Sequence, residues 1–272
     1  QDKDPDAEVW QGRRVGAEAA LSVFSLDEAF ELSELNEALL ETLLGHDNLY
    51  FALGENKQAD ALVLDALQAL REAPKASLAP YSMHDTRPML HEMRVFKSAC
   101  EVAVMKTAGR ISAAAHKRAM QFVKPGCYEY HLEAELHHSF AMQGARTPAY
   151  STIVGSGENG CILHYTENSA QIKDGDLVLV DAGCEYQGYA ADITRTFPAN
   201  GTFSKPQRDI YEWVLKAQEA VLTTLGPGST LGEAMQQSAE VITEGLVSLG
   251  LLGGTIAENQ KYSTVRVIKA ST

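Results

Sequence analysis

The segment LVLVDAGCEYQGYAADITRTFP, at residues 177–198, constrains the fold more than any other stretch of this chain. Its β-branched and aromatic residues predict two strands, over residues 177–184 and 189–197. Between them, Gly188 supplies the positive φ that a tight turn demands. The segment therefore predicts an antiparallel hairpin, and with it an antiparallel sheet.

The turn position decides which side chains of this hairpin face each other. With the turn centred between Tyr186 and Gln187, Asp181 and Asp192 become direct cross-strand partners on one face. Two carboxylates this close repel each other unless they share a proton or bind a cation. Apolar neighbours indicate partial burial, which favours a cation because an unpaired buried carboxylate is costly. The alternatives are solvated aspartates on an open face, or a register one residue off that points them apart.

A second informative segment, TIVGSGENGCILHYTEN, spans residues 152–168. Its glycines permit sharp turns, but no long helix follows them and no P-loop lysine is present, which argues against a nucleotide-binding loop. His164 stands between a short apolar run and a polar loop, a position suited to presenting an imidazole to a cleft. A purely structural role for this histidine is the alternative.

Three further histidines, His131, His137 and His138, lie on a helix predicted over residues 128–142. Their spacing lacks the H-E-x-x-H pattern of zinc peptidases, so a solvated helical face is the favoured interpretation. The sequence also lacks the G-x-S-x-G elbow of serine hydrolases.

Charge and cysteine content narrow the class of protein. The 272 residues carry 23 Lys and Arg against 36 Asp and Glu, a net charge of −13, and no dense basic stripe. This balance argues against nucleic-acid partners and anionic membranes. The four cysteines are widely spaced, which predicts no disulfide framework and a reducing compartment. No apolar run approaches the roughly 20 residues of a membrane span, so we expect a cytoplasmic protein.

Periodicity predicts two regions along the chain. Helices over residues 25–44 and 57–71 flank a strand at 48–53, and a proline-spaced segment over 74–88 is the candidate linker. Beyond the linker, Ser98 and Glu101 form a capping box that should begin a long helix. That helix is expected to end near residue 123, and the other elements predicted beyond it are the helix over 128–142, a strand over 150–154, and helices over 205–225 and 230–249.

These motifs together identify a family. The segment over 152–168 and the hairpin, read with HEMRVFKS, AGRISAAAHKRAM, YEYHLEAELHHSF and GARTPAY, strongly resemble the Xaa-Pro aminopeptidases (aminopeptidase P) of the pita-bread metallopeptidase group. The resemblance covers roughly residues 1–255. It implies an α/β (α+β) protein: the C-terminal part of an amino-terminal α/β domain over 1–90, then over 91–254 the first half of a pita-bread catalytic domain with an antiparallel sheet and flanking helices.

The resemblance also implies chemistry. It implies hydrolysis of the bond between an N-terminal residue and a following proline. It also implies a dinuclear metal site, usually of manganese, with other divalent cations as substitutes. Asp181 and Asp192 match the two metal-binding aspartates of the family, and His164 matches a histidine that contacts substrate. The implied partners are peptides with proline in the second position, and a homo-oligomer, dimer or tetramer, is expected by analogy.

The last stretch, residues 255–272, departs from the family pattern. The resemblance places a ligand histidine and two glutamates after this point, whereas the stretch holds no histidine and a single carboxylate, Glu258. We expect a divergent tail caused by a frame shift or a truncated gene, and a chain that is nearly inactive alone. A prolidase-type Xaa-Pro dipeptidase and a non-catalytic peptide-binding module with the same fold are the alternative functions.

Overall fold

The computed structural model describes residues 3–72 and 78–259 of the chain. These residues divide into two compact units, with the boundary between Lys97 and Ser98, and each is described separately. Within the described ranges, no helix combines the length and the apolar character that a bilayer span requires.

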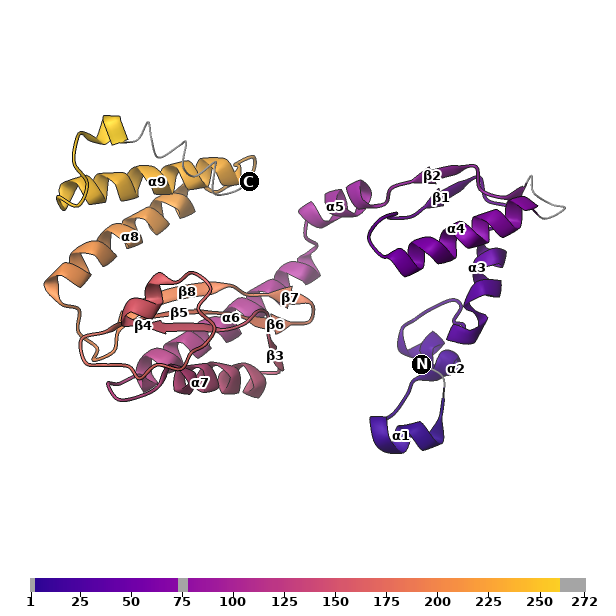
Figure 1. The fold of residues 1–272 in the computed structure, drawn as a ribbon, viewed down its shortest axis with the longest axis horizontal. Helices are drawn as coiled ribbons and strands as arrows, with labels where there is room; N and C mark the ends of the chain where they lie inside the picture. Colours follow the sequence, from indigo (N-terminus) through magenta and orange to yellow (C-terminus); the bar gives the residue numbers. More distant parts are fainter. Residues whose placement is uncertain (1–2, 73–77, 260–272) are drawn as a thin grey trace. The chain divides into compact units, whose positions relative to one another are not determined.

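The first unit is a small α/β structure (Figure 1). Its parallel strands β1 (Asn48–Tyr50) and β2 (Ser82–His84) pair through Asn48 and Ser82. Its helices are α1 (Pro5–Gln11), α2 (Gly16–Val23), α3 (Leu35–Leu43) after a short 3-10 turn η1 (Leu32–Glu34), α4 (Lys57–Glu72) and α5 (Arg87–Val95). The apolar sides of α3 and α4 form its core, with Leu43, Val63 and Leu67 among the buried residues.

Two predictions for this unit are wrong. The helix expected over 25–44 begins only at Leu35, because Ser25 adopts a left-handed φ of 53° that ends α2, and Leu26 and Phe30 stay half exposed without a surface to pack on. The proline-spaced segment expected as a linker contains β2 and the start of α5, since β2 completes the sheet with β1. Residues 73–77 of that segment lie outside the described ranges.

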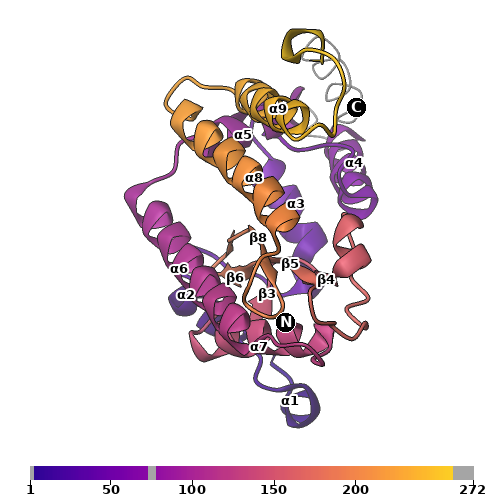
Figure 2. The same ribbon diagram turned by 90° about the vertical axis from the view of Figure 1, so that its left-hand side faces the viewer.

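The second unit begins with two long helices. The capping box at Ser98 is confirmed, because the Ser98 hydroxyl accepts from the Glu101 N–H and the Glu101 carboxylate accepts from the Ser98 N–H. It begins α6 (Ala99–Phe122), which α7 (Glu129–Met142) follows after Pro125 and Gly126. The two helices pack side by side, as Figure 2 shows.

Short antiparallel strands follow the helices. One sheet has the order β4 (Ile153–Ser156), β5 (Leu177–Ala182) and β8 (Ile193–Pro198); the other has β3 (Thr147–Pro148), β6 (Cys184–Tyr186) and β7 (Tyr189–Ala190). A 3-10 turn, η3 (Gly157–Cys161), leaves β4. The predicted hairpin is thus present, but each of its long strands is divided in two.

Alternation along β5 separates two environments. Val178, Val180 and Ala182 are fully buried and pack with α6 and α7 in the core of this unit. Leu177, Leu179 and Asp181 point to the opposite face and are half-buried. Asp181 therefore lies on the sheet face away from the two core helices.

The hairpin register differs from the prediction by two residues. Gln187 and Gly188 both have positive φ, of 49° and 84°, which is the pattern of a two-residue type I′ turn. The turn centre lies one residue further along the chain than expected, so Asp181 pairs with Thr194 instead of Asp192. Because the shift moves the partner by an even number, both aspartates keep the same face.

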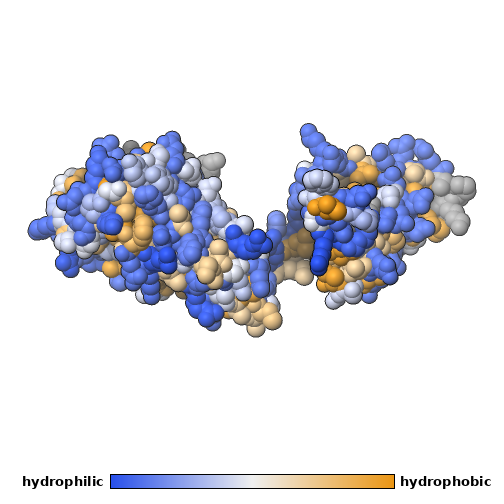
Figure 3. Space-filling view, turned by 90° about the horizontal axis from the view of Figure 1, so that it is seen from below, coloured by the Kyte–Doolittle hydropathy of each residue, from blue (hydrophilic) through white to orange (hydrophobic). Residues whose placement is uncertain are grey.

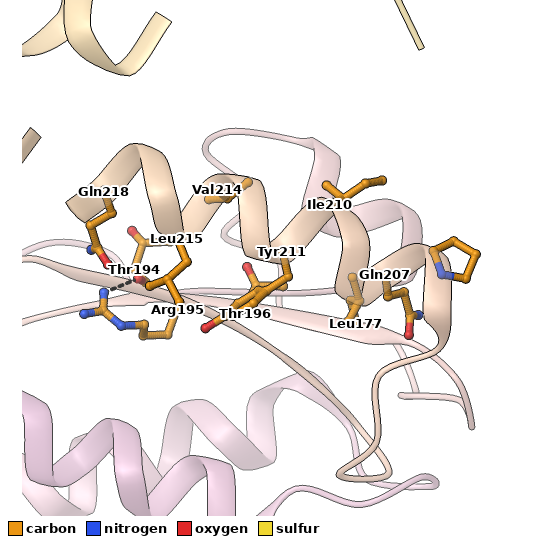
Figure 4. Close-up of a pocket in the computed structure, with 11 residues that line it drawn as sticks. Leu177, Thr194, Arg195, Thr196, Gln207, Ile210, Tyr211, Val214, Leu215 and Gln218 are labelled. Atoms are coloured by element: carbon orange, nitrogen blue, oxygen red, sulfur yellow. Dashed lines mark hydrogen bonds between the residues drawn. The ribbon is translucent and has the colours of Figure 1, made fainter. Parts of the chain in front are cut away.

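Two more helices, α8 (Lys205–Thr224) and α9 (Leu231–Ser248), pack against each other and complete the second unit. A groove of about 650 Å³ lies between α8 and the strand face that carries Leu177, Thr194 and Thr196 (Figure 4). From α8, Ile210, Tyr211, Val214 and Leu215 are among its lining residues.

Apolar side chains also reach the surface of both units among mostly hydrophilic neighbours (Figure 3).

Candidate metal and substrate site

The two hairpin aspartates converge on one hydroxyl group. The Tyr150 hydroxyl lies 2.6 Å from Asp181 Oδ1 and 3.1 Å from Asp192 Oδ1. Burial raises the pKa of Tyr150, and the hydrogen bond to Asp181 raises it further, so the phenol keeps its proton. The Tyr150 hydroxyl has only one proton to donate, and one proton cannot offset the repulsion between two carboxylates.

Gly183, in the Asp-Ala-Gly motif, makes this convergence sterically feasible. A Cβ atom at position 183 would lie 1.4 Å from the Ala191 carbonyl oxygen, so no other residue type fits. The close crossing of the two chain segments at Gly183 and Ala191 brings Asp192 beside Asp181, although the two are not direct cross-strand partners. Glycine at this position is therefore a requirement of the site.

The chemistry of the donors fits a divalent metal ion in part. Carboxylate oxygens are hard ligands that suit Mg²⁺, Ca²⁺ or Mn²⁺, and a cation between Asp181 and Asp192 would relieve their repulsion. Across residues 3–72 and 78–259, no group of three or more His, Cys, Asp and Glu side chains gathers around a common point. The described residues thus offer two carboxylates as candidate ligands and no third side chain beside them.

His164 does not join the aspartate pair. It lies in the loop after η3 and is exposed, as are its neighbours Ile162 and Leu163. Within the described ranges, no hydrogen bond links it to Asp181 or Asp192. The structure presents the imidazole to solvent and leaves its substrate contact a prediction.

A buried carboxylate, Glu129, holds the loop that carries His164. Glu129 is fully buried, and its Oε1 accepts from the Ser156 N–H and hydroxyl, 2.7 and 2.8 Å away, and from the Asn159 amide, 3.2 Å away. Its Oε2 accepts from the Tyr165 hydroxyl at 2.8 Å and the Ala170 N–H at 2.9 Å. These bonds tie both ends of residues 156–170 to the first turn of α7.

The charge state of Glu129 follows from these partners. Burial acts to raise the pKa of Glu129, but the hydrogen bonds from Ser156 and Ala170 outweigh it, so the pKa lies below its usual value. The positive end of the α7 dipole also favours the anion. Burial and the bond to Glu129 raise the pKa of Tyr165, the residue next to His164, so that hydroxyl remains a donor.

The same face of α7 continues this polar network. Asn168, which is almost fully buried, accepts from the Val154 N–H and donates to the Thr152 carbonyl and to Glu133. One turn further, His137 Nε2 lies 2.8 Å from the Thr152 hydroxyl. The prediction of a solvated helical face is therefore wrong for His137, although His138 is exposed.

Sequence reasoning missed Tyr150, Glu129 and Asn168. Residues 129, 133 and 137 recur at helical spacing, which could have indicated a polar stripe facing a partner. Nothing in the local sequence names that partner, because the contacts of Glu129 lie 27–41 residues further along the chain. Tyr150 ends the GARTPAY motif, but nothing in that motif indicates that its hydroxyl bonds to the hairpin aspartates.

Comparison with known families assigns both regions. Residues 103–264 match the model of metallopeptidase family M24, and residues 1–50 match the aminopeptidase P N-terminal domain. The chain is 52% identical over 257 residues to the Xaa-Pro aminopeptidase of Escherichia coli (strain K12), covering 94% of this chain and 58% of that relative. The chain therefore spans less than two thirds of the length of that protein.

Solved structures give the same answer. Zinc-substituted E. coli aminopeptidase P in complex with product matches with a TM-score of 0.91 at 51% identity, over 95% of this chain and 59% of the other. Proline aminopeptidase P II from Yersinia pestis matches with a TM-score of 0.91 at 50% identity, over 96% of this chain and 60% of the other. Both the fold and the sequence of this chain are thus of the aminopeptidase P kind. The chain belongs to metallopeptidase family M24, and it does so as an aminopeptidase P homologue.

Proposed function

We propose that the protein is a metal-dependent aminopeptidase that releases the first residue from peptides with proline in the second position. The observation that carries the proposal is the convergence of Asp181 and Asp192 on the Tyr150 hydroxyl, in a chain of the M24 family. Similarity to the Xaa-Pro aminopeptidase of E. coli supports this function over the prolidase alternative.

Family membership implies divalent metal ions, and we propose Mn²⁺ held in part by Asp181 and Asp192. When bound, such ions supply Lewis-acid polarisation of the peptide carbonyl and a nucleophilic hydroxide at neutral pH. Tyr150 keeps its proton between the two carboxylates and holds both oriented toward a common point. The exposed His164 imidazole donates a hydrogen bond to the bound substrate, and Glu129 fixes the loop that presents it.

The extents of the domains and the cell compartment belong to the same proposal. We assign residues 1–90 to an amino-terminal domain, residues 91–254 to the first half of the catalytic domain and residues 255–272 to a divergent tail, of which 260–272 lie outside the described ranges. A cytoplasmic location, a homo-oligomer and near-inactivity of this chain alone stay predictions.

Binding of Mn²⁺ tests the metal assignment. The free Mn²⁺ signal in electron paramagnetic resonance should fall as the 272-residue chain is added, with saturation. Asp181→Asn and Asp192→Asn should each weaken binding about tenfold or more, while Asp174→Asn, an exposed loop aspartate on the same segment, should not. Equal binding by all four proteins would refute the assignment.

A second titration tests the substrate. A tripeptide with proline in the second position should change the spectrum of bound Mn²⁺, and the matching peptide with alanine there should have a weaker effect. Equal effects of the two peptides would argue against proline specificity. Release of the first residue, measured in parallel on tripeptides and dipeptides, tests the predicted inactivity of this chain. Any residual activity on tripeptides would favour the aminopeptidase over the prolidase.

A further inference from the structure

Two buried polar side chains on α6 have no role in the site as described so far. Ser112 is 0% exposed and His116 is 3% exposed, and they stand one helical turn apart among buried alanines. Such positions in a helix–sheet interface ordinarily hold apolar residues. Both side chains instead reach the backbone of β5 and β6 at the Asp-Ala-Gly motif.

Their hydrogen bonds lie on either side of Gly183. His116 Nε2 lies 3.0 Å from the Ala182 carbonyl oxygen, and because a carbonyl only accepts, Nε2 carries the ring proton. The Ser112 hydroxyl oxygen accepts from the Cys184 N–H at 3.0 Å and lies 3.4 Å from Cys184 Sγ. We call Ser112 and His116 the α6 clamp.

The clamped backbone lies where the sheet ladder is interrupted. β4 stops pairing with β5 at Ile153 and Asp181, and β8 stops pairing with it at Ala182 and Ile193. His116 binds the carbonyl of that last paired residue, Ala182. The Gly183 carbonyl accepts from the Ala149 N–H, and the Ala191 carbonyl presses against the Gly183 Cα. The α6 clamp therefore supplies hydrogen-bond partners, from the helix side of the sheet, at the point where β5 passes into β6.

Burying a histidine at position 116 has a cost in free energy that an apolar residue would not have. His116 Nδ1 is buried and has no hydrogen-bond partner within the described ranges, and burial lowers the pKa of the ring, so it is neutral. An apolar side chain of similar size would avoid the unpartnered nitrogen. What it would lose is the bond to the carbonyl of Ala182, the residue that directly follows Asp181.

We propose that the α6 clamp positions the aspartate pair, by fixing the backbone between Asp181 and Asp192 at the spacing that a divalent cation requires. The inference rests on the proposed function, because it needs these aspartates to bind the cation. Ser112 and His116 act through the backbone and touch neither carboxylate. Outer-shell groups of this kind change metal affinity by about 10–100-fold in proteins.

The test is Mn²⁺ affinity of the full 272-residue chain, measured by electron paramagnetic resonance. His116→Phe keeps the ring and removes the donor, and it should weaken Mn²⁺ binding about 10–100-fold. His116→Gln places an amide N–H near the position of Nε2 and should restore most of the affinity. Ser112→Ala leaves the Cys184 N–H without its acceptor and should weaken binding in the same direction. Ile111→Val, a packing change on the same helix, should leave affinity unchanged.

The outcomes separate the inference from the proposed function. Saturable Mn²⁺ binding that depends on Asp181 but is the same in His116→Phe, Ser112→Ala and wild type would overturn the clamp and leave the metal site standing. Weak binding in both His116→Phe and His116→Gln would also overturn it, since volume and not the donor would then matter. Binding that ignores Asp181 would overturn both proposals. Circular dichroism checks that each variant folds, and if His116→Phe does not, Ser112→Ala and His116→Gln decide.

Discussion

Replacing Glu129 by glutamine should destabilise the second unit far more than the loss of one negative charge suggests. Each carboxylate oxygen accepts from a backbone N–H that cannot reverse its role, Ser156 at Oε1 and Ala170 at Oε2. The glutamine amide has one oxygen, so its NH₂ group must face one of these donors. The backbone N–H that it faces and one NH₂ hydrogen are then both left without an acceptor, at about 1–3 kcal/mol each, which predicts a loss of about 2–6 kcal/mol in the free energy of unfolding.

A matched control lies one turn along α7. Glu133 is half-buried and accepts a single side-chain bond, from Asn168, that a glutamine oxygen can also accept. Glu133→Gln should therefore cost less than about 1 kcal/mol. Urea unfolding followed by circular dichroism measures both variants, and hydrogen exchange over residues 156–170 locates the effect.

The pH dependence of this difference has a definite sign. The pKa of Glu129 is lowered in the folded chain, so its stabilisation is complete above the ordinary glutamate pKa of about 4.3 and is lost as pH falls through the lower folded pKa. The gap between wild type and Glu129→Gln should therefore narrow on acidification. Equal stability of the Glu129→Gln and Glu133→Gln variants at neutral pH would refute the reasoning.

Three other substitutions test separate features. Gly183→Ala should prevent the close crossing with Ala191 and abolish native folding of the hairpin. The control is Gly109→Ala, in open space on α6, which should raise the free energy of unfolding by about 0.5–1 kcal/mol. Thermal unfolding of the two variants measures the difference. Ser98→Ala should lower the free energy of unfolding by about 1 kcal/mol, because it removes the N-terminal cap of α6. Thr107→Ala, which removes a hydroxyl from the middle of the same helix, is its control in urea unfolding. Tyr150→Phe should destabilise the metal-free chain by about 1–3 kcal/mol, and added Mn²⁺ should restore the loss; a variant that melts like wild type without metal would contradict the role of the hydroxyl.

Local signals predicted much of the second unit. The Ser98 capping box and the Lys-Pro-Gly stop fix the ends of α6 through contacts within three or four residues, and both are present in the structure. The hairpin was predicted because strand propensity and Gly188 agree. Its register was wrong because Gln187 also adopts positive φ, which is uncommon for a residue other than glycine.

The supporting residues could not be predicted in the same way. Glu129 contacts Ser156 and Ala170, and His116 contacts Ala182, which lies 66 residues away. Such pairs depend on how α6 and α7 lie on the sheet, and no local pattern records that. The first part of the helix expected over 25–44 did not form because Leu26 and Phe30 found no surface on which to pack, whereas its second part is α3 and packs in the core.

The type I′ turn at Gln187 and Gly188 has a consequence for how this hairpin can change in length. The limbs beyond Gly183 and Ala191 are matched one against one, with Glu185 opposite Ala190 and Tyr186 opposite Tyr189. Residues added in equal number to both limbs would lengthen the tip and leave the crossing below it untouched. A single residue added to one limb would shift the pairing by one position and turn either Asp181 or Asp192 toward α6 and α7. A reporter sequence inserted at the tip should therefore add the same number of residues to each limb.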